Sequence, residues 1–434
     1  MNRSVIVLVM LVAIAATARA QTAPVRLTLD DAIAQGLAAS HRLAEIGARQ
    51  DAARAVEEQR RALAMPEVAL LAGYTRTNHV DVFGIPGGRV IYPDIPDNVR
   101  SRIDLQWPIY TGGRTSALTR AAAAEANAMG VDRDVARADL KLEISRAYWA
   151  VVTARASVDV VNAALGRIGA HLNDVRNQLS VGLVPPSDVL TLEAQQARQQ
   201  QLLIEAQNLV ETSSADFRRL LGLAPDTPFE LTDRIDTPLA PSRPAAPLVE
   251  AARANRSERK ALEIRIGASS ERKTAAEAER RPLIATGAGY DAARPNAKIF
   301  PREAAWKPSW DIGVNLSWSL FDGGRVRAEV AEAAANQRAA EERLKDFDAT
   351  LDAEVRQRAA DLASAEAAIA AADAGIRSAE EAQRVIAERF SAGVATNTDV
   401  IDAQVALLQA ELDRTRALAN VHIAEARLDR ALGQ

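Results

Sequence analysis

The sequence predicts a mainly α-helical fold with a membrane β-barrel portion, built from two tandem structural repeats. The 434-residue chain is 48% hydrophobic but only 4% aromatic. Alanine, the best helix former, supplies much of this apolar content. Apolar residues recur at heptad spacing over two long windows, which indicates coiled-coil helices. Landmarks of the first half return 211 positions later, as Gly182 and Gly393 do, which indicates an internal repeat.

Residues 1–20 have the pattern of a secretory signal peptide. Arg3 precedes an apolar run, Val5–Ala16, and Ala18-Arg19-Ala20 resembles a cleavage site. The mature chain is expected to begin at Gln21, outside the cytoplasm. No later stretch has the 18 or so consecutive apolar residues of a transmembrane helix. A mature chain that enters a membrane is therefore expected to do so as a closed β-barrel.

The first repeat is predicted to span residues 21–222 and the second 249–434. Two further landmark pairs share the same offset: Tyr110–Arg114 with Phe321–Arg325, and Leu221–Gly222 with Leu432–Gly433. Six prolines lie in the join, residues 223–248, which predicts an extended linker.

Each repeat is expected to contain a helix, two strands, a long helix, a turn and a further helix. In the first repeat we expect strands at about 66–77 and 99–110, and helices over 114–180 and 187–221. In the second we expect strands at about 282–291 and 310–321, and helices over 325–391 and 398–432. Proline is absent from 109–184 and from 309 onwards, which permits uninterrupted helix.

The long helices carry the heptad pattern. From Leu140 to Leu179, twelve positions separated by alternating steps of four and three are all apolar, and ten of the twelve positions 211 residues later are apolar too. A period of 3.5 predicts a left-handed supercoil. At 1.5 Å per residue, the helix over 114–180 is expected to be about 100 Å long.

The predicted strands alternate apolar and polar residues. The clearest case is Trp310, Ile312, Val314, Leu316 and Trp318, a length typical of tilted transmembrane strands. Eleven of the 17 aromatic residues fall within 66–113 and 282–324, as in interfacial girdles. The alternative is a pair of soluble amphipathic hairpins that cap a coiled coil. Four strands are too few to close a barrel. Two copies would supply eight strands, and three would supply twelve.

Composition excludes several classes of function. The absence of cysteine rules out disulfides and thiolate sites, and a net charge of −4 argues against a nucleic-acid partner. The histidines show no HExxH spacing and no cluster suited to a metal; they are His41, His79, His171 and His422. We therefore expect no enzymatic activity, no cofactor and no metal site.

Four segments resemble the outer-membrane efflux protein family, the TolC-like channel-tunnels: LTLDDAIAQGL (27–37), PIYTGGR (108–114), SLFDGGR (319–325) and RFSAGVATNTDVIDAQ (389–404). The resemblance covers essentially the whole mature chain. It implies a homotrimer with a twelve-stranded barrel in the outer-membrane lipid of a Gram-negative bacterium and a helical barrel extending into the periplasm.

The same resemblance implies an exit duct of a tripartite efflux or type I secretion system. The implied partners are a periplasmic adaptor (membrane fusion) protein and an inner-membrane transporter. The alternative is a periplasmic coiled-coil scaffold protein without a pore. The exported substrate is not assigned.

The glycine-containing turns after the long helices have two interpretations. Glycine is a usual C-terminal cap, and Thr396 with Asp399 fits a capping box. The resemblance implies instead that these turns are adaptor-docking tips, formed by Gly182, Leu183, Val184, Gly393, Val394, Ala395 and Thr396. It also implies that Asp188, Asp399 and Asp402 line a pore constriction. Phe390 and Ala395 stand where some relatives have tethering Tyr and Arg, so the resemblance implies that those tethers are weakened or absent.

Two double glycines precede the long helices. They are expected to turn the chain from strand into helix, and they are Gly112, Gly113, Gly323 and Gly324.

Overall fold

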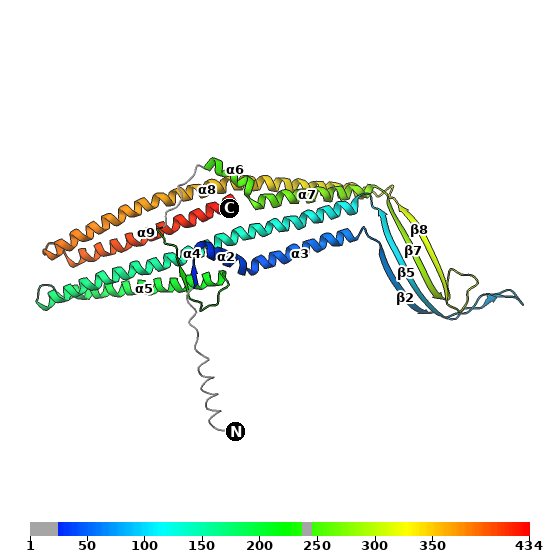
Figure 1. Cartoon of the computed structure of the whole chain (residues 1–434), viewed down its shortest axis with the longest axis horizontal. Coiled ribbons are helices and arrows are strands. Elements are labelled where there is room, and N and C mark those ends of the chain that lie inside the picture. Colours follow the sequence, from blue (N-terminus) through cyan, green and yellow to red (C-terminus); the bar gives the residue numbers. More distant parts are fainter. Residues whose placement is uncertain (1–24, 237–244) are drawn as a thin grey trace, which may run out of the picture. The chain divides into compact units, whose positions relative to one another are not determined.

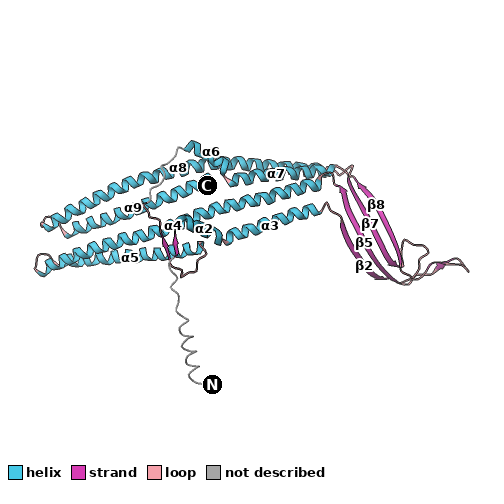
Figure 2. Cartoon of the chain, viewed as in Figure 1, coloured by secondary structure: helices cyan, strands magenta, loops and turns pink. Residues whose placement is uncertain are grey.

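The computed structural model describes residues 25–236 and 245–434 (Figure 1). The expected signal peptide, residues 1–20, lies outside the described residues. As predicted, the described chain is mainly helical (Figure 2).

The two repeats follow nearly the same element order, which confirms the tandem structural repeat. The first contains β1 (Val25–Leu27), α2 (Leu29–Ala39), α3 (His41–Ala62), β2 (Glu67–Arg76), β3 (Phe83–Gly84), β4 (Val90–Tyr92), β5 (Asp97–Tyr110), α4 (Arg114–Ser180), α5 (Pro186–Leu220) and β6 (Phe229–Leu231). The second contains α6 (Ala245–Asn255), α7 (Ser257–Glu277), the 3₁₀ turn η2 (Ala278–Arg280), β7 (Leu283–Arg294), β8 (Lys307–Ser317), α8 (Arg325–Ser391) and α9 (Asn397–Leu432).

The long helices α4 and α8 are each 67 residues. Each begins directly after a double glycine and ends two residues before another glycine with positive φ. Both ends are therefore set by glycines, which adopt positive φ without steric cost. Among the described residues, no helix combines the length and the apolar composition required to cross a membrane.

The chain divides into two compact units, and each is described by itself. The first comprises the described residues up to Leu43 with Ala136–Arg256 and Leu351–Gln434, and the second comprises Ala44–Val135 with Ser257–Thr350.

The core of the first unit follows the heptad seam of α4. Near the turn, Ile168, Leu172 and Val175 are buried against α5 and against Ile401 of α9. In α8, Leu351, Val355 and Leu362 are buried, whereas the later seam positions are only half-buried. That stretch of the seam is rich in alanine, whose short side chain covers little of a neighbouring helix. The two repeats therefore share a pattern but differ in packing.

The start of the described chain is held by a buried tyrosine. β1 and β6 pair in parallel, and the Tyr148 hydroxyl donates to the Leu27 carbonyl at 3.3 Å and accepts from the Asp233 amide at 3.2 Å. The Tyr148 ring makes an edge-to-face contact with Phe217 of α5. This buried hydroxyl thereby has partners for both of its hydrogen-bonding roles.

The second unit contains a four-stranded antiparallel sheet in the order β2-β5-β7-β8. The two repeats join through the pairing of β5 with β7. β8 runs from Lys307 to Ser317, earlier than the expected 310–321, because its partner β7 begins at Leu283, which pairs with Ser317. Both hairpin connections, 77–96 and 295–306, emerge at the sheet end away from the double glycines.

Candidate functional site

One face of the sheet is apolar and exposed. Leu70, Ile103, Tyr290 and Trp310 stand opposite one another across all four strands, and such cross-strand partners project to the same face. The parallel row of Val68, Leu105, Ala288 and Ile312 extends this surface. Trp310 is 74% exposed and Ile312 is 70% exposed. An apolar patch of this kind needs a lipid or protein cover.

The opposite face of the sheet is polar and charged. The Arg102 guanidinium lies 2.7 Å from Asp104, 2.7 Å from Asp291 and 2.8 Å from Asp311. A Cβ at Gly289 would overlap this guanidinium, so the glycine leaves the room that it needs. Arg100 also pairs with Asp291, at 2.8 Å. Charges of this density are unfavourable in hydrocarbon, so the two faces suit different surroundings.

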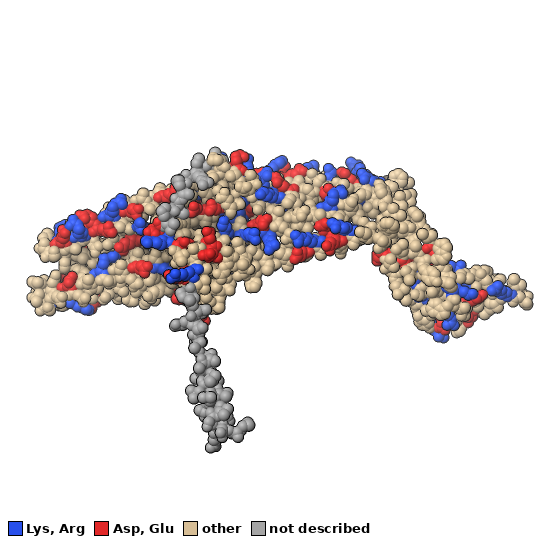
Figure 3. All heavy atoms as spheres, in the orientation of Figure 1, with Lys and Arg blue, Asp and Glu red and all other residues tan. Residues whose placement is uncertain are grey.

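Charged side chains are spread along the molecule outside this face. On the side drawn in Figure 3, Lys and Arg are interspersed with Asp and Glu along the helices, and they gather again at the loop end of the sheet. Mixed charge of this kind is typical of a solvated surface.

The four glycines of the strand-to-helix turns all have positive φ, between 65° and 90°. In the first turn, Arg281 donates to the Gly112 carbonyl at 2.8 Å. In the second, the Asp322 carboxylate accepts from the Gly324 and Val326 amides, both at 2.9 Å, and these backbone hydrogen bonds lower the pKa of Asp322. The conformation of both turns depends on glycine.

A single carboxylate links the two turns. Glu279 lies 3.0 Å from Arg114 and 2.8 Å from Arg325, the arginines that follow each double glycine. The hydrogen bond from Arg325 lowers the pKa of Glu279. The sequence pattern had not singled out Glu279, because its two partners lie far from it in the chain.

We predict that Gly112→Ala lowers thermal stability more than Gly323→Ala. Both substitutions force an L-residue into the left-handed region, at about 1–2 kcal/mol. Only at Gly112 would the new Cβ meet close neighbours, the Ala278 carbonyl oxygen and the Arg281 Cβ, each at 2.8 Å. Thermal unfolding of the two variants in detergent measures the difference. Equal shifts in Tm would contradict the packing argument.

The two helical turns of the first unit share one capping geometry. The Leu183 amide donates to the Gln178 carbonyl at 2.9 Å and the Val394 amide donates to the Arg389 carbonyl at 2.8 Å. Gly182 and Gly393, with φ of 78° and 72°, complete Schellman motifs. Beside them, Leu183 is 74% exposed and Val394 is 65% exposed. The turns thus present apolar side chains that no described residue covers.

The three carboxylates expected at a constriction lie in different surroundings. Asp399 accepts from the Thr396 amide and hydroxyl, both at 2.7 Å, and these hydrogen bonds lower its pKa. This is the capping box that the sequence allowed. Asp402, one turn further along α9, is exposed, and Asp188 is half-buried. The first turn has Pro185 at the N-cap and no side-chain cap, so the matched turns differ here.

A buried polar link joins the two helical hairpins of the first unit. The His171 Nε2 lies 2.9 Å from the Asn397 Oδ1, and the Asn397 Nδ2 donates to the Asp188 carbonyl at 3.2 Å. The Phe390 ring stands edge-on to His171, with 5.1 Å between centroids. Phe390 therefore packs within its own chain, and α9 begins beside the first hairpin.

Within the described ranges, no group of three or more His, Asp or Glu side chains is arranged to hold a metal ion.

Comparison with known proteins gives consistent matches over most of the chain. A family model described as "Outer membrane efflux protein" matches residues 32–223 and 248–434. The chain is 28% identical to protein CyaE of Bordetella pertussis, over 91% of this chain and 83% of that protein. It is 24% identical to outer membrane protein TolC of Vibrio cholerae, over 90% and 87%. The crystal structure of outer membrane protein VceC from Vibrio cholerae has the same fold, with a TM-score of 0.78 at 20% identity, covering 93% of this chain and 96% of that one.

Proposed function

Because this chain belongs to the outer membrane efflux protein family, we propose that it is the channel-tunnel of a tripartite efflux or type I secretion system. In this role it is a passive exit duct for substrates that an inner-membrane pump delivers through a periplasmic adaptor. The protein resides in the outer membrane of a Gram-negative bacterium and extends into the periplasm. Its family is one of efflux channels and not of enzymes.

The two-faced sheet is the observation that carries the proposal. Its apolar face suits lipid and its charged face suits a water-filled lumen, which is the arrangement of transmembrane barrels. Among the described strands, β2 and β8 each have one unpaired edge, and unpaired edges are not tolerated in hydrocarbon. Pairing of β8 with β2 of the next copy closes the sheet. Three copies give twelve strands, enough for an open lumen.

The helical turns support a partner protein for the duct. Leu183 and Val394 are exposed apolar side chains on turns that the Schellman motifs fix. A rigid turn that presents apolar residues loses little conformational entropy when a partner covers it. We propose that this partner is a periplasmic adaptor and that it docks on the tips Gly182–Val184 and Gly393–Thr396. We also propose that Asp188, Asp399 and Asp402 lie near the pore constriction.

The purified protein is expected to be a trimer in detergent, to show strong helical circular dichroism and to conduct ions in a planar bilayer. Four strands per chain cannot close a barrel alone, so conductance requires assembly. Mass measurement in detergent and single-channel recording test this directly. A detergent-free monomer that stays in the soluble fraction after cell fractionation would contradict the channel and would favour a periplasmic scaffold.

A further inference from the structure

The connection between β7 and β8, residues 295–306, is folded over the charged face of the sheet. Asn296 is 4% exposed, and its Nδ2 donates to the Lys307 carbonyl and to the Ser309 hydroxyl, both at 2.9 Å. Its Oδ1 accepts from the Lys298 amide at 2.9 Å. Ser309 belongs to the same row as Arg102 and Asp291. These bonds hold the start of the connection on the charged face.

Lys298 anchors this connection to the strands beneath it. Its ammonium lies 2.9 Å from Asp291 and also contacts Asp311, which stands one row further from the loop end. The two carboxylates differ in exposure: the Asp291 side chain is 4% exposed, whereas the Asp311 side chain is 46% exposed. These carboxylates raise the pKa of Lys298, so the anchor stays charged at neutral pH.

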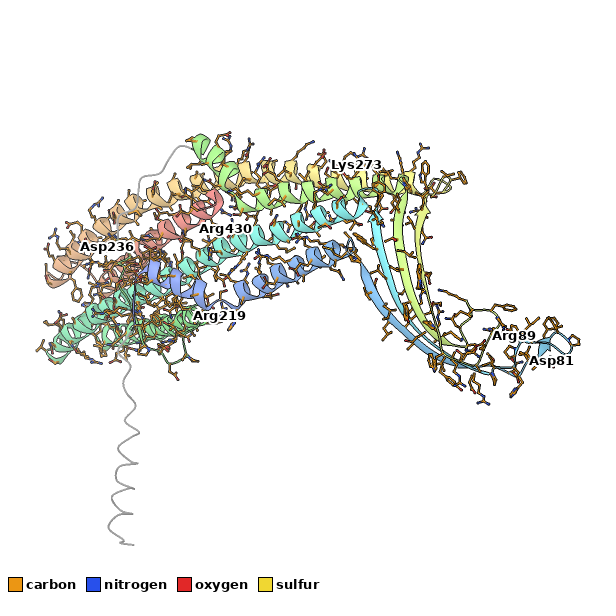
Figure 4. The ribbon with its side chains drawn as sticks, turned by 45° about the vertical axis from the view of Figure 1, so that its right-hand side comes forward. Asp81, Arg89, Arg219, Asp236, Lys273 and Arg430 are labelled. Carbon is orange, nitrogen blue, oxygen red and sulfur yellow. The ribbon has the colours of Figure 1, made fainter. Side chains whose placement is uncertain are left out.

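The outer part of the connection is braced by the other hairpin connection, residues 77–96. Arg302 donates to the Tyr92 hydroxyl at 2.8 Å, and Arg89 lies 3.2 Å from Glu303. Figure 4 labels Arg89 together with Asp81 in this region. Between residues 295–302 and the charged face of β2 and β5 lies a hollow of about 620 Å³. The connection therefore overhangs the face as an arm.

We propose that residues 295–306 form a lid over the outer mouth of the pore, and that Lys298 is its latch. The inference rests on the proposed function, because the charged face lines a lumen only if the sheet closes into a channel. In that channel the three arms reach inward at the loop end. Each arm narrows the exit until its latch separates from Asp291 and Asp311.

Lys298→Met tests the latch, because methionine keeps an unbranched side chain but cannot pair with a carboxylate. Its single-channel conductance is expected to be roughly twofold that of the wild type, since narrowing of a wet pore limits ion flow. The matched control is Lys307→Met. Lys307 lies in the same region and pairs with Glu303 at 3.2 Å, but that pair does not reach the sheet carboxylates, so its conductance should be unchanged.

A reversible cross-link makes the test independent of any folding defect in Lys298→Met. The chain has no cysteine, so Lys298→Cys with Asp311→Cys introduces the only thiols. A short bifunctional reagent with a reducible linker is expected to join them, holding conductance at or below the wild-type level, and reduction should raise it roughly twofold. The control is His79→Cys with Asp94→Cys, a pair within residues 77–96 whose side chains lie 2.6 Å apart and whose cross-link should leave conductance unchanged.

Failure of the lid is distinguishable from failure of the channel. Channels that form but conduct equally before and after reduction would overturn the lid, as would failure of the thiols to cross-link. Absence of channels in the wild type would overturn the proposed function itself. Higher conductance in Lys298→Met and in the reduced double variant, with unchanged controls, supports the latch.

Discussion

Val314→Arg is expected to prevent the sheet from inserting into a bilayer, whereas Asn315→Arg is expected to be tolerated. Val314 lies near the middle of β8 on the apolar face and is exposed. Arginine near the bilayer midplane of a transmembrane barrel costs about 2–4 kcal/mol. At 1.4 kcal/mol per factor of ten, each substituted chain therefore disfavours insertion by roughly 30-fold or more. Folding into lipid vesicles, followed by protease protection, measures the effect.

Asn315→Arg is the matched control, because neighbouring residues of a strand project to opposite faces. Asn315 projects to the same face as the Arg102 network, where water would solvate the introduced guanidinium. Insertion of Val314→Arg at the wild-type level would contradict lipid contact by the apolar face. Failure of Asn315→Arg would contradict a water-filled lumen.

The second expected result is that Asp402→Ala relieves block of the channel by divalent cations at its periplasmic end. Three copies of this exposed carboxylate near one axis would attract cations. We expect the half-blocking concentration to rise by roughly tenfold, with little change in Tm. Titration of calcium or magnesium into the periplasmic-side chamber of a planar bilayer measures this.

Thr396→Ala separates charge from capping. Loss of the cap should lower stability by about 1 kcal/mol, while the divalent block persists because Asp399 and Asp402 remain. Asp399→Ala should lower stability and also relieve the divalent block, since the Asp399 carboxylate accepts hydrogen bonds from Thr396 and carries charge. Unchanged block in the Asp399→Ala and Asp402→Ala double variant, with a lower Tm, would show that these aspartates only hold a helix end.

The capping bond also sets a pH dependence. The Thr396 hydrogen bonds hold the pKa of Asp399 below its ordinary value of 3.8. A carboxylate with a lowered folded-state pKa stabilises the fold fully above the unfolded-state pKa, and this contribution is lost as the pH falls through the lowered value. The stabilising contribution of Asp399 should therefore be constant at neutral pH and disappear only in acid.

The helices could be predicted from the sequence because their signals are local. The seam from Leu140 to Leu179 is a periodicity, and the glycines that end α4 and α8 act through their own φ. Strand ends were less accurate, since the ladder at β8 stops at Ser317, opposite Leu283, the first residue of β7. Nothing near Ser317 in the chain encodes that register.

The parts of the candidate site that escaped prediction depend on distant partners. His171 and Asn397 are 226 positions apart, and Glu279 joins arginines on either side of it that are themselves far apart. The alternation of charged residues in β5 indicated a polar face, but not that Arg102 would contact three carboxylates.

The matching helical hairpins of the two repeats have a consequence for symmetry. In the proposed trimer, six hairpins of almost equal length would surround one axis, so the backbone would approach sixfold symmetry. The side chains reduce it to threefold. Thr396 and Asp399 form a capping box where the first repeat has Pro185 and Asp188, and Thr191 occupies the position that corresponds to Asp402 at the repeat offset of 211 residues. Adjacent hairpins around the ring would thus alternate in charge and stiffness. A ring of this kind offers a partner two distinct kinds of groove, each present three times.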